Sequence, residues 1–99
     1  MAVHRIDTPG MPIVRAHGPL AARTWQLVLA DLRDLIEEGH PRMGLDLSRV
    51  TWMGRWQAEV LLEARERLVL NGRVLSLISL SPAAITALSR AATRKSSTG

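Results

Sequence analysis

The sequence predicts a single α/β domain in which helices alternate with the strands of a mostly parallel sheet. Apolar residues recur at helical spacing in three segments, short β-prone runs lie between these segments, and glycine or proline marks most junctions. Ninety-nine residues, 46% of them apolar, suit one domain with a modest core. We place this domain at residues 1–89. Residues 90–99, which are basic and rich in serine and threonine, are expected to finish the last helix and then to form a disordered tail.

The first half of the chain predicts a hairpin followed by a helix. Residues 3–6 and 13–16 are β-prone and lie on either side of Thr8-Pro9-Gly10, whose proline and glycine favour a turn. Residues 20–38 carry their apolar side chains on one stripe and most of their charges elsewhere, as a helix packed on a core does. Gly39 stands where a C-terminal cap is expected. The stripe consists of Trp25, Val28, Leu32, Leu35 and Ile36.

The second half predicts two further strand and helix pairs. Residues 43–47 resemble a strand that is covered on both faces, and we expect residues 48–54 to form a turn. An amphipathic helix then ends at Asn71-Gly72, and residues 73–79 form the last strand. Ser81-Pro82 begins the last helix, because serine can accept hydrogen bonds from first-turn amides and proline has no amide hydrogen. The apolar faces consist of Ala58, Leu61, Leu62, Ala64 and Leu68, with Arg65 beside them, and of Ile85, Leu88 and Ala92.

These elements give the order β-β-α-β-α-β-α. Right-handed crossovers would place the helices against a mixed four-stranded sheet, with the hairpin supplying its antiparallel pair. Element order by itself does not establish a function.

The charge is concentrated at the C-terminus. The net charge is +4, and residues 1–89 contribute only +1 of it, from ten arginines and nine acidic residues. Arg90, Arg94 and Lys95 supply the other three charges. Because a basic terminal segment is usually solvated, we expect no nucleic-acid partner.

Several other classes of function are disfavoured by composition and spacing. No apolar run approaches the roughly 20 residues that cross a bilayer, and the first fifteen residues lack the apolar core of a signal peptide, so we expect a cytoplasmic protein without membrane insertion. The chain has no cysteine, and His4, His17 and His40 are not at metal-ligand spacing. We therefore predict no catalytic residue, no metal site and no cofactor.

One segment, from residue 45 to residue 64, is especially informative and reads LDLSRVTWMGRWQAEVLLEA. It resembles the signature of STAS domains, the fold of bacterial anti-sigma factor antagonists. In that family a strand ends in Asp-Leu-Ser-Gly-Val, and the following turn, Asp-Ser-Ser-Gly, carries the phosphorylated residue at its second serine. This chain keeps Asp46, Leu47, Ser48 and Val50. The resemblance extends from about residue 13 to residue 92 and implies the element order given above.

The segment departs from the family at the switch itself. Gly54-Arg55-Trp56-Gln57 replaces Asp-Ser-Ser-Gly, so Trp56 stands at the family's phosphoacceptor position. Neither arginine nor tryptophan can accept a phosphate, and the sequence therefore predicts that the ordinary phosphorylation switch is absent. Ser48 and Thr51 lie nearby and carry hydroxyls that could be modified instead, but they are better explained structurally, since Ser48 closes the strand and Thr51 is β-prone. Asp46 is expected to bond turn amides.

The resemblance implies a protein-interaction module that docks through the turn and the second helix. Trp25 belongs to the predicted core, Trp52 is expected to pack under the turn, and Trp56 occupies a position that faces solvent in the family. The predicted partner-binding residues are Arg55, Trp56, Gln57, Glu59 and Glu63, and the predicted switch-loop residues are Ser48, Thr51, Trp52 and Gly54.

The resemblance leaves the partner open. An anti-sigma factor with a kinase-type fold, or a larger signalling assembly, is the first expectation. An accessory subunit of a membrane transporter, docked on an ATPase or permease, is the alternative. A sensor with a small-ligand pocket around Trp52 and Trp56 is a third reading, and a homodimer stays open.

Overall fold

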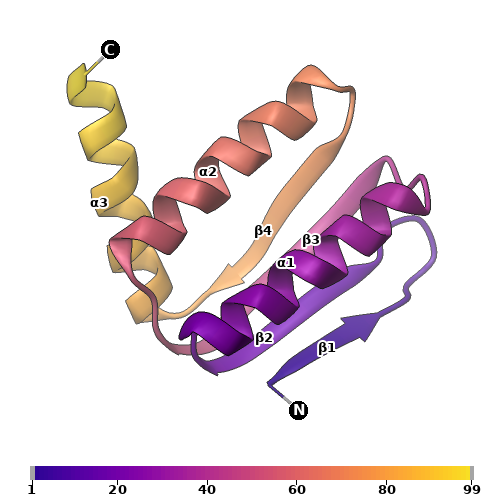
Figure 1. The fold of residues 1–99 in the computed structure, drawn as a ribbon, viewed down its shortest axis with the longest axis horizontal. Helices are drawn as coiled ribbons and strands as arrows, with labels where there is room; N and C mark the ends of the chain where they lie inside the picture. The colour runs from indigo at the N-terminus through magenta and orange to yellow at the C-terminus, as the bar shows by residue number, and fades with distance from the viewer. Residues whose placement is uncertain (1, 99) are drawn as a thin grey trace.

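A computed structural model describes the backbone of residues 2–98 and the side chains as far as residue 93. The strands and helices alternate as the sequence predicts (Figure 1), which confirms the α/β class and the element order. The strands are β1 (Val3–Ile6), β2 (Ile13–Pro19), β3 (Arg42–Trp52) and β4 (Val74–Leu80). The helices are α1 (Ala22–Glu37), α2 (Arg55–Leu70) and α3 (Pro82–Thr98).

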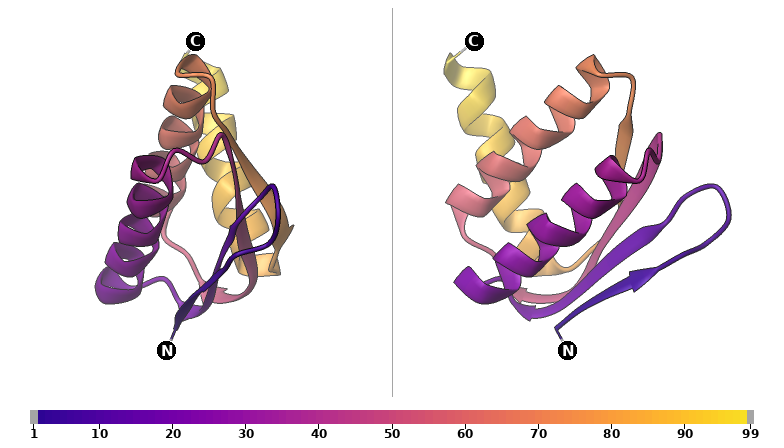
Figure 2. Two further views of the ribbon diagram at one scale, coloured as in Figure 1. Left: turned by 90° about the vertical axis from the view of Figure 1, so that its right-hand side faces the viewer. Right: turned by 45° about the vertical axis from the view of Figure 1, so that its right-hand side comes forward.

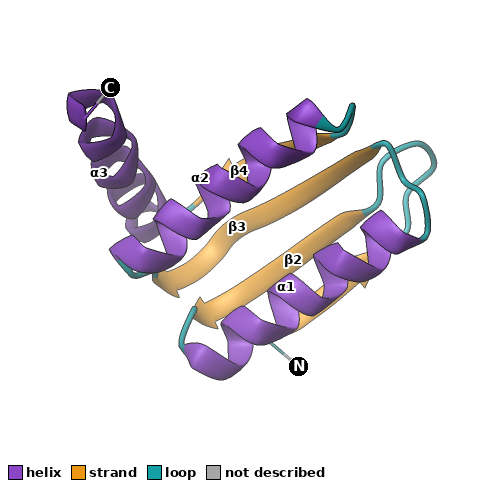
Figure 3. Ribbon diagram, turned by 45° about the horizontal axis from the view of Figure 1, so that its top comes forward, coloured by secondary structure: helices purple, strands orange, loops and turns teal. Residues whose placement is uncertain are grey.

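The four strands form one mixed sheet in the order β1-β2-β3-β4. β1 and β2 pair antiparallel as the predicted hairpin, whereas β2 with β3 and β3 with β4 are parallel. α1 and α2 lie on the same face of this sheet (Figures 2 and 3), and α3 contacts α2 and β3. β3 therefore lies inside the sheet, between β2 and β4, and the two residues that follow it lead directly into α2.

The core lies between the sheet and α1 and α2, and it also includes buried residues of α3 such as Ala84 and Leu88. Trp25, Val28, Leu32 and Leu35 are buried along α1, as their spacing predicts, and Ile36 packs against them while partly exposed. All residues of the predicted strand 43–47 are buried. Because the apolar spacing of α1 and the continuous apolar run of β3 both reflect burial, these parts of the core were predictable.

Two glycines end helices in the way that their positions in the chain predict. Gly39 and Gly72 have positive φ, +87° and +76°, a conformation that costs glycine little. After α1 the Gly39 amide donates to Ile36 O (3.0 Å) and the next amide, that of His40, donates to Leu35 O (3.2 Å). Gly72 begins the same pattern after α2. This pairing uses carbonyls that the last turn of a helix leaves without partners, so each helix ends sharply before a strand.

β3 is longer than predicted. It continues to Trp52, where Pro19 of β2 pairs with it, so that residues 48–52 belong to a strand and only Met53 and Gly54 separate β3 from α2. The predicted turn at residues 48–54 is therefore wrong. The cause is tertiary, because Val50 is buried in the core and the parallel pairing with β2 extends the strand through polar residues.

The last helix also differs from its prediction. Ile85 is 50% exposed and Ala92 is exposed, whereas Ala84 and Leu88 are buried with Ala87 and Ala91. The buried face is therefore made mostly of alanine, which permits close packing against α2 and β3. α3 extends to Thr98. We placed the end of the domain at residue 89 and expected the residues after it to finish this helix before a disordered tail. The side chains of residues 94–98, and all of residue 99, lie outside the described part of the chain.

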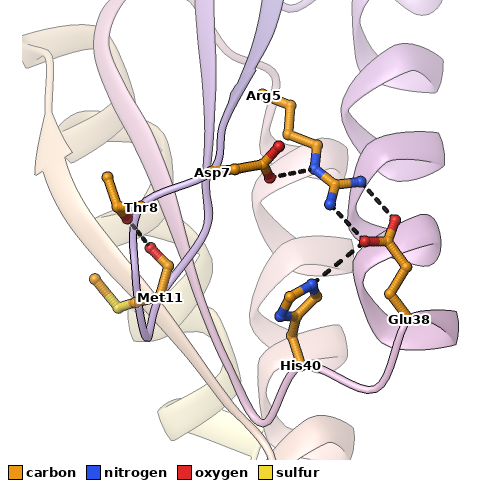
Figure 4. Close-up of polar contacts among 6 residues, drawn as sticks. All are labelled: Arg5, Asp7, Thr8, Met11, Glu38 and His40. Atoms are coloured by element: carbon orange, nitrogen blue, oxygen red, sulfur yellow. Dashed lines mark hydrogen bonds and ion pairs between the residues drawn. The ribbon is translucent and has the colours of Figure 1, made fainter.

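An ion-pair cluster joins the hairpin to the end of α1 (Figure 4). The Arg5 guanidinium donates to both carboxylate oxygens of Glu38, at 2.6 and 2.5 Å, and to Asp7 Oδ1 at 2.7 Å. His40 Nε2 lies 3.3 Å from Glu38 Oε1. These bonds, the Arg5 bond first among them, lower the pKa of Glu38 from its ordinary value of 4.5 to about 2.

The Glu38→Gln substitution should remove a stabilising contribution that depends on pH. Because the pKa of Glu38 is lower in the folded state, its contribution is complete above about pH 5, declines below pH 4.5 and is lost near pH 2. We expect the difference in unfolding free energy between the natural chain and the variant to follow that course, as measured by urea unfolding at several pH values. Glu37→Gln is the matched control, and a pH-independent difference at position 38 would contradict the assignment.

Candidate docking site

The candidate site lies where β3 ends and α2 begins. The Leu20 amide donates to Trp52 O at 2.8 Å, which fixes the end of β3 against the start of the α1 segment. Gly54 is the N-cap of α2, its carbonyl accepts from the Ala58 amide at 3.1 Å, and no side chain caps the helix. The first turn of α2 contains no acidic residue. This helix end therefore keeps the partial positive charge of its first-turn amides, with no acidic or capping side chain to offset it.

Gln57 faces inward rather than toward solvent. Its side chain is 9% exposed, and Nε2 donates to Leu20 O at 3.1 Å. A Cβ placed at Gly54 would collide with Gln57 Oε1, so the glycine leaves the space that this side chain occupies. Gln57 was predicted to bind a partner, and its burial contradicts that prediction. It connects the start of α2 to the segment before α1.

Trp52 and Trp56 are the two large aromatic side chains that remain exposed, at 51% and 63% respectively. Trp52 was expected to pack under the turn, and this is wrong, because Met53 is the residue that turns into the core there. Trp56 faces solvent in the first turn of α2, with the exposed Arg55 beside it in the chain. We call Trp52, Arg55 and Trp56 the docking surface.

The other residues that we predicted for the site lie at separate places in the structure. Ser48 and Thr51 are exposed on β3, and Glu59 is partly buried on α2. Glu63 is about two turns along α2 from Arg55, where it borders a groove between α1 and α2 that Leu29, Leu32 and Val60 also line. The structure therefore separates Glu63 from the docking surface.

A hollow of about 370 Å³ lies beside the docking surface, between the β3–α2 junction and α3. We call it the Trp52 hollow. It is lined by Trp52, Met53 and Arg55 and, from α3, by Pro82, Ala83, Thr86, Ala87 and Arg90. Arg90 had been assigned to the tail. The spacing of Ala83, Thr86, Ala87 and Arg90, which places them on one face of a helix, is the signal that could have located it here.

A family model for the STAS domain matches residues 3–97, which is nearly the whole chain. The chain belongs to the STAS domain family. A search of curated proteins finds no match. STAS domains include anti-sigma factor antagonists and transporter-associated domains, and they are generally non-catalytic modules that mediate protein–protein interactions.

In this STAS domain Asp46 supports the strand that leads to the docking surface. It is 8% exposed, Oδ1 accepts from the Ser48 amide at 2.9 Å, and Oδ2 accepts from Arg15 Nε at 3.0 Å. Burial alone would raise the pKa of this carboxyl, but the hydrogen bonds from Ser48 and Arg15 outweigh it and lower the pKa. Asp46 therefore holds a backbone amide, as the sequence predicts, although that amide belongs to β3 and not to a turn.

The histidines of this STAS domain lie away from the docking surface. His4 and His17 stack on neighbouring strands with ring centroids 5.3 Å apart, and His40 accompanies Glu38. Among the residues that the structure describes, no group of three or more histidine or acidic side chains could hold a metal ion. No helix in the described range is long and apolar enough to cross a membrane.

Proposed function

We propose that this STAS domain is a regulator of the anti-sigma factor antagonist type, which binds another protein through Trp52, Arg55 and Trp56. The observation that supports this best is the exposure of both tryptophans at one junction, in a chain that buries its third tryptophan almost completely. Large aromatic side chains left in water are costly unless a partner covers them, and tryptophan and arginine are the residue types most enriched at interface hot spots.

The proposed partner is a cytoplasmic anti-sigma factor with a kinase-type fold, or a larger signalling assembly of that class. The family resemblance supports this choice, and the docking surface supports the mode of binding. The proposed binding groups, Trp52, Arg55 and Trp56, are already exposed at the surface. They therefore need no cofactor to contact a partner.

Regulation is proposed to differ from that of the usual antagonist. Trp56, in the first turn of α2, stands at the family's phosphoserine position and offers no hydroxyl. Incubation with ATP and a kinase that phosphorylates antagonist serines should therefore leave the intact mass of this chain unchanged. A control antagonist that keeps its serine should gain one phosphate in the same reaction. Stoichiometric phosphate on residues 48–57 of this chain would contradict the proposal.

The docking role predicts a large loss of binding on Trp56→Ala. Truncation of a hot-spot tryptophan costs at least about 2 kcal/mol, which is roughly a 30-fold loss of affinity. The binding protein would first be isolated by affinity capture on the natural chain, and its dissociation constant would then be measured by calorimetry against the natural chain and the variant. Because Trp56 is 63% exposed, the unfolding midpoint should hardly change.

Leu70→Ala is the matched control. Leu70 lies at the other end of α2 and is 85% exposed, so its truncation removes apolar surface of the same helix outside the docking surface. This variant should bind as tightly as the natural chain. Equal affinity for the Trp56→Ala variant would exclude the docking role, and its failure to fold would place Trp56 in the core.

A further inference from the structure

We infer that the segment bound by the docking surface is acidic, and that one of its carboxylates enters the Trp52 hollow between Arg55 and Arg90 while a neighbouring apolar side chain contacts Trp52. This inference rests on the proposed function and specifies the chemistry of the partner.

The charged residues that line the Trp52 hollow are all positive. Arg55 comes from α2 and Arg90 from α3, and none of the residues that line the hollow is acidic. Ion pairs elsewhere in the domain join Arg5 and His40 to Glu38, Arg5 to Asp7, and Arg15 to Asp46. Two guanidinium groups on different helices can each donate paired hydrogen bonds to one carboxylate or to neighbouring ones.

The helix ends at the hollow add to this positive character. α2 begins at Arg55 and α3 begins at Pro82, both of which line the hollow, and neither helix has an acidic residue in its first turn. The partial positive charge at each N-terminus is thus not offset by an acid in the first turn of its own helix. A carboxylate placed between the two arginines would be attracted by the guanidinium groups and by both helix ends.

The remaining lining accepts an apolar side chain. Met53, Ala83 and Ala87 are apolar, and the half-exposed indole of Trp52 lies beside them. The volume, about 370 Å³, is at the small end of ligand-binding pockets and is enough for an aliphatic or aromatic side chain together with a carboxylate. Trp56 is not among the lining residues, so exposed aromatic surface continues beyond the hollow. This continuation favours an extended peptide segment over a small free anion.

Selection from a random 12-residue peptide library tests the inference without a known partner. The full-length natural chain would be immobilised, and peptides eluted from it would be sequenced, synthesised and measured by fluorescence polarisation. We expect the enriched peptides to carry aspartate or glutamate next to an apolar residue. Arg55→Glu/Arg90→Glu should weaken their binding at least about 30-fold, since reversing the charges leaves the peptide carboxylate without a counter-charge.

Arg33→Glu/Arg65→Glu is the matched control. It makes the same change of net charge at two exposed helix positions outside the hollow, and should leave affinity within about twofold. If the charge reversal disturbs folding, the Arg55→Gln/Arg90→Gln variant takes its place, and its unfolding midpoint shows whether it is folded. This variant should also bind the peptides more weakly than the natural chain. Stronger salt dependence in the natural chain than in either Arg55/Arg90 variant would support the same contact.

The outcomes separate this inference from the proposed function. Enriched peptides that are neutral or basic, or acidic peptides that bind the Arg55/Arg90 variants as tightly as the natural chain, overturn the inference. If such peptides still lose affinity on Trp56→Ala, the docking function stands and only the acidic chemistry fails. A library that yields no peptide dependent on Trp56 overturns both.

Discussion

Trp25→Ala is expected to destabilise the domain by about 3–5 kcal/mol, the largest effect of any single truncation that we propose. The Trp25 side chain is 3% exposed and packs between α1 and the sheet, so its removal both loses buried apolar area and leaves a cavity. Its Nε1 has no hydrogen-bond acceptor among the described residues. The loss therefore comes from packing rather than from a polar contact. For a domain of ordinary stability, this is a large share of the total.

Urea unfolding followed by far-UV circular dichroism would measure this effect. Gln26→Ala is the matched control, since Gln26 is the next residue along α1 and is exposed; it should change the unfolding free energy by no more than about 0.5 kcal/mol. A loss below about 1 kcal/mol for the Trp25→Ala variant would mean that α1 does not bury this face against the sheet.

Asp46→Ala is expected to cost about 1.5–3 kcal/mol, because it removes the acceptor of hydrogen bonds from the Ser48 amide and from Arg15. The Ser48 amide is on β3, the strand that carries Trp52. Loss of the Asp46 carboxylate leaves this amide without its acceptor and so loosens the strand. Asp46→Asn, which keeps an acceptor oxygen but not the charge, should recover part of the loss. Asp7→Ala removes an exposed ion pair with Arg5 and should cause no measurable change.

The Asp46 effect should also depend on pH. Since the pKa of Asp46 is lowered in the folded state, its contribution is complete above the unfolded-state pKa of about 4 and is lost as the pH falls through the folded-state value. The stability gap between the natural chain and the Asp46→Ala variant should therefore be constant from neutral pH down to about 4 and narrow below it. A gap that widens in acid would contradict the hydrogen-bonding arrangement.

The structure of the candidate docking site was only partly predictable, and the reason differs from one residue to the next. The exposure of Trp56 agrees with the position expected from the family, because the first turn of α2 is set by local sequence. Gln57 was misplaced because its partner, Leu20 O, is remote in the chain. Trp52 was misplaced because pairing with Pro19 of β2 continues β3 beyond its apolar run. Arg90 was missed because basic composition suggested a tail, whereas α3 carries it to the hollow.

The sequence by itself determined the element order, the family and the helix ends. These follow from interactions between residues near one another in the chain, such as the apolar stripe of α1, the capping glycines Gly39 and Gly72, and Ser81, whose Oγ accepts from the Ala84 amide. Only the tertiary structure decided the length of β3 and the residues of the Trp52 hollow. Both depend on contacts between segments far apart in the chain, which local periodicity and capping cannot specify.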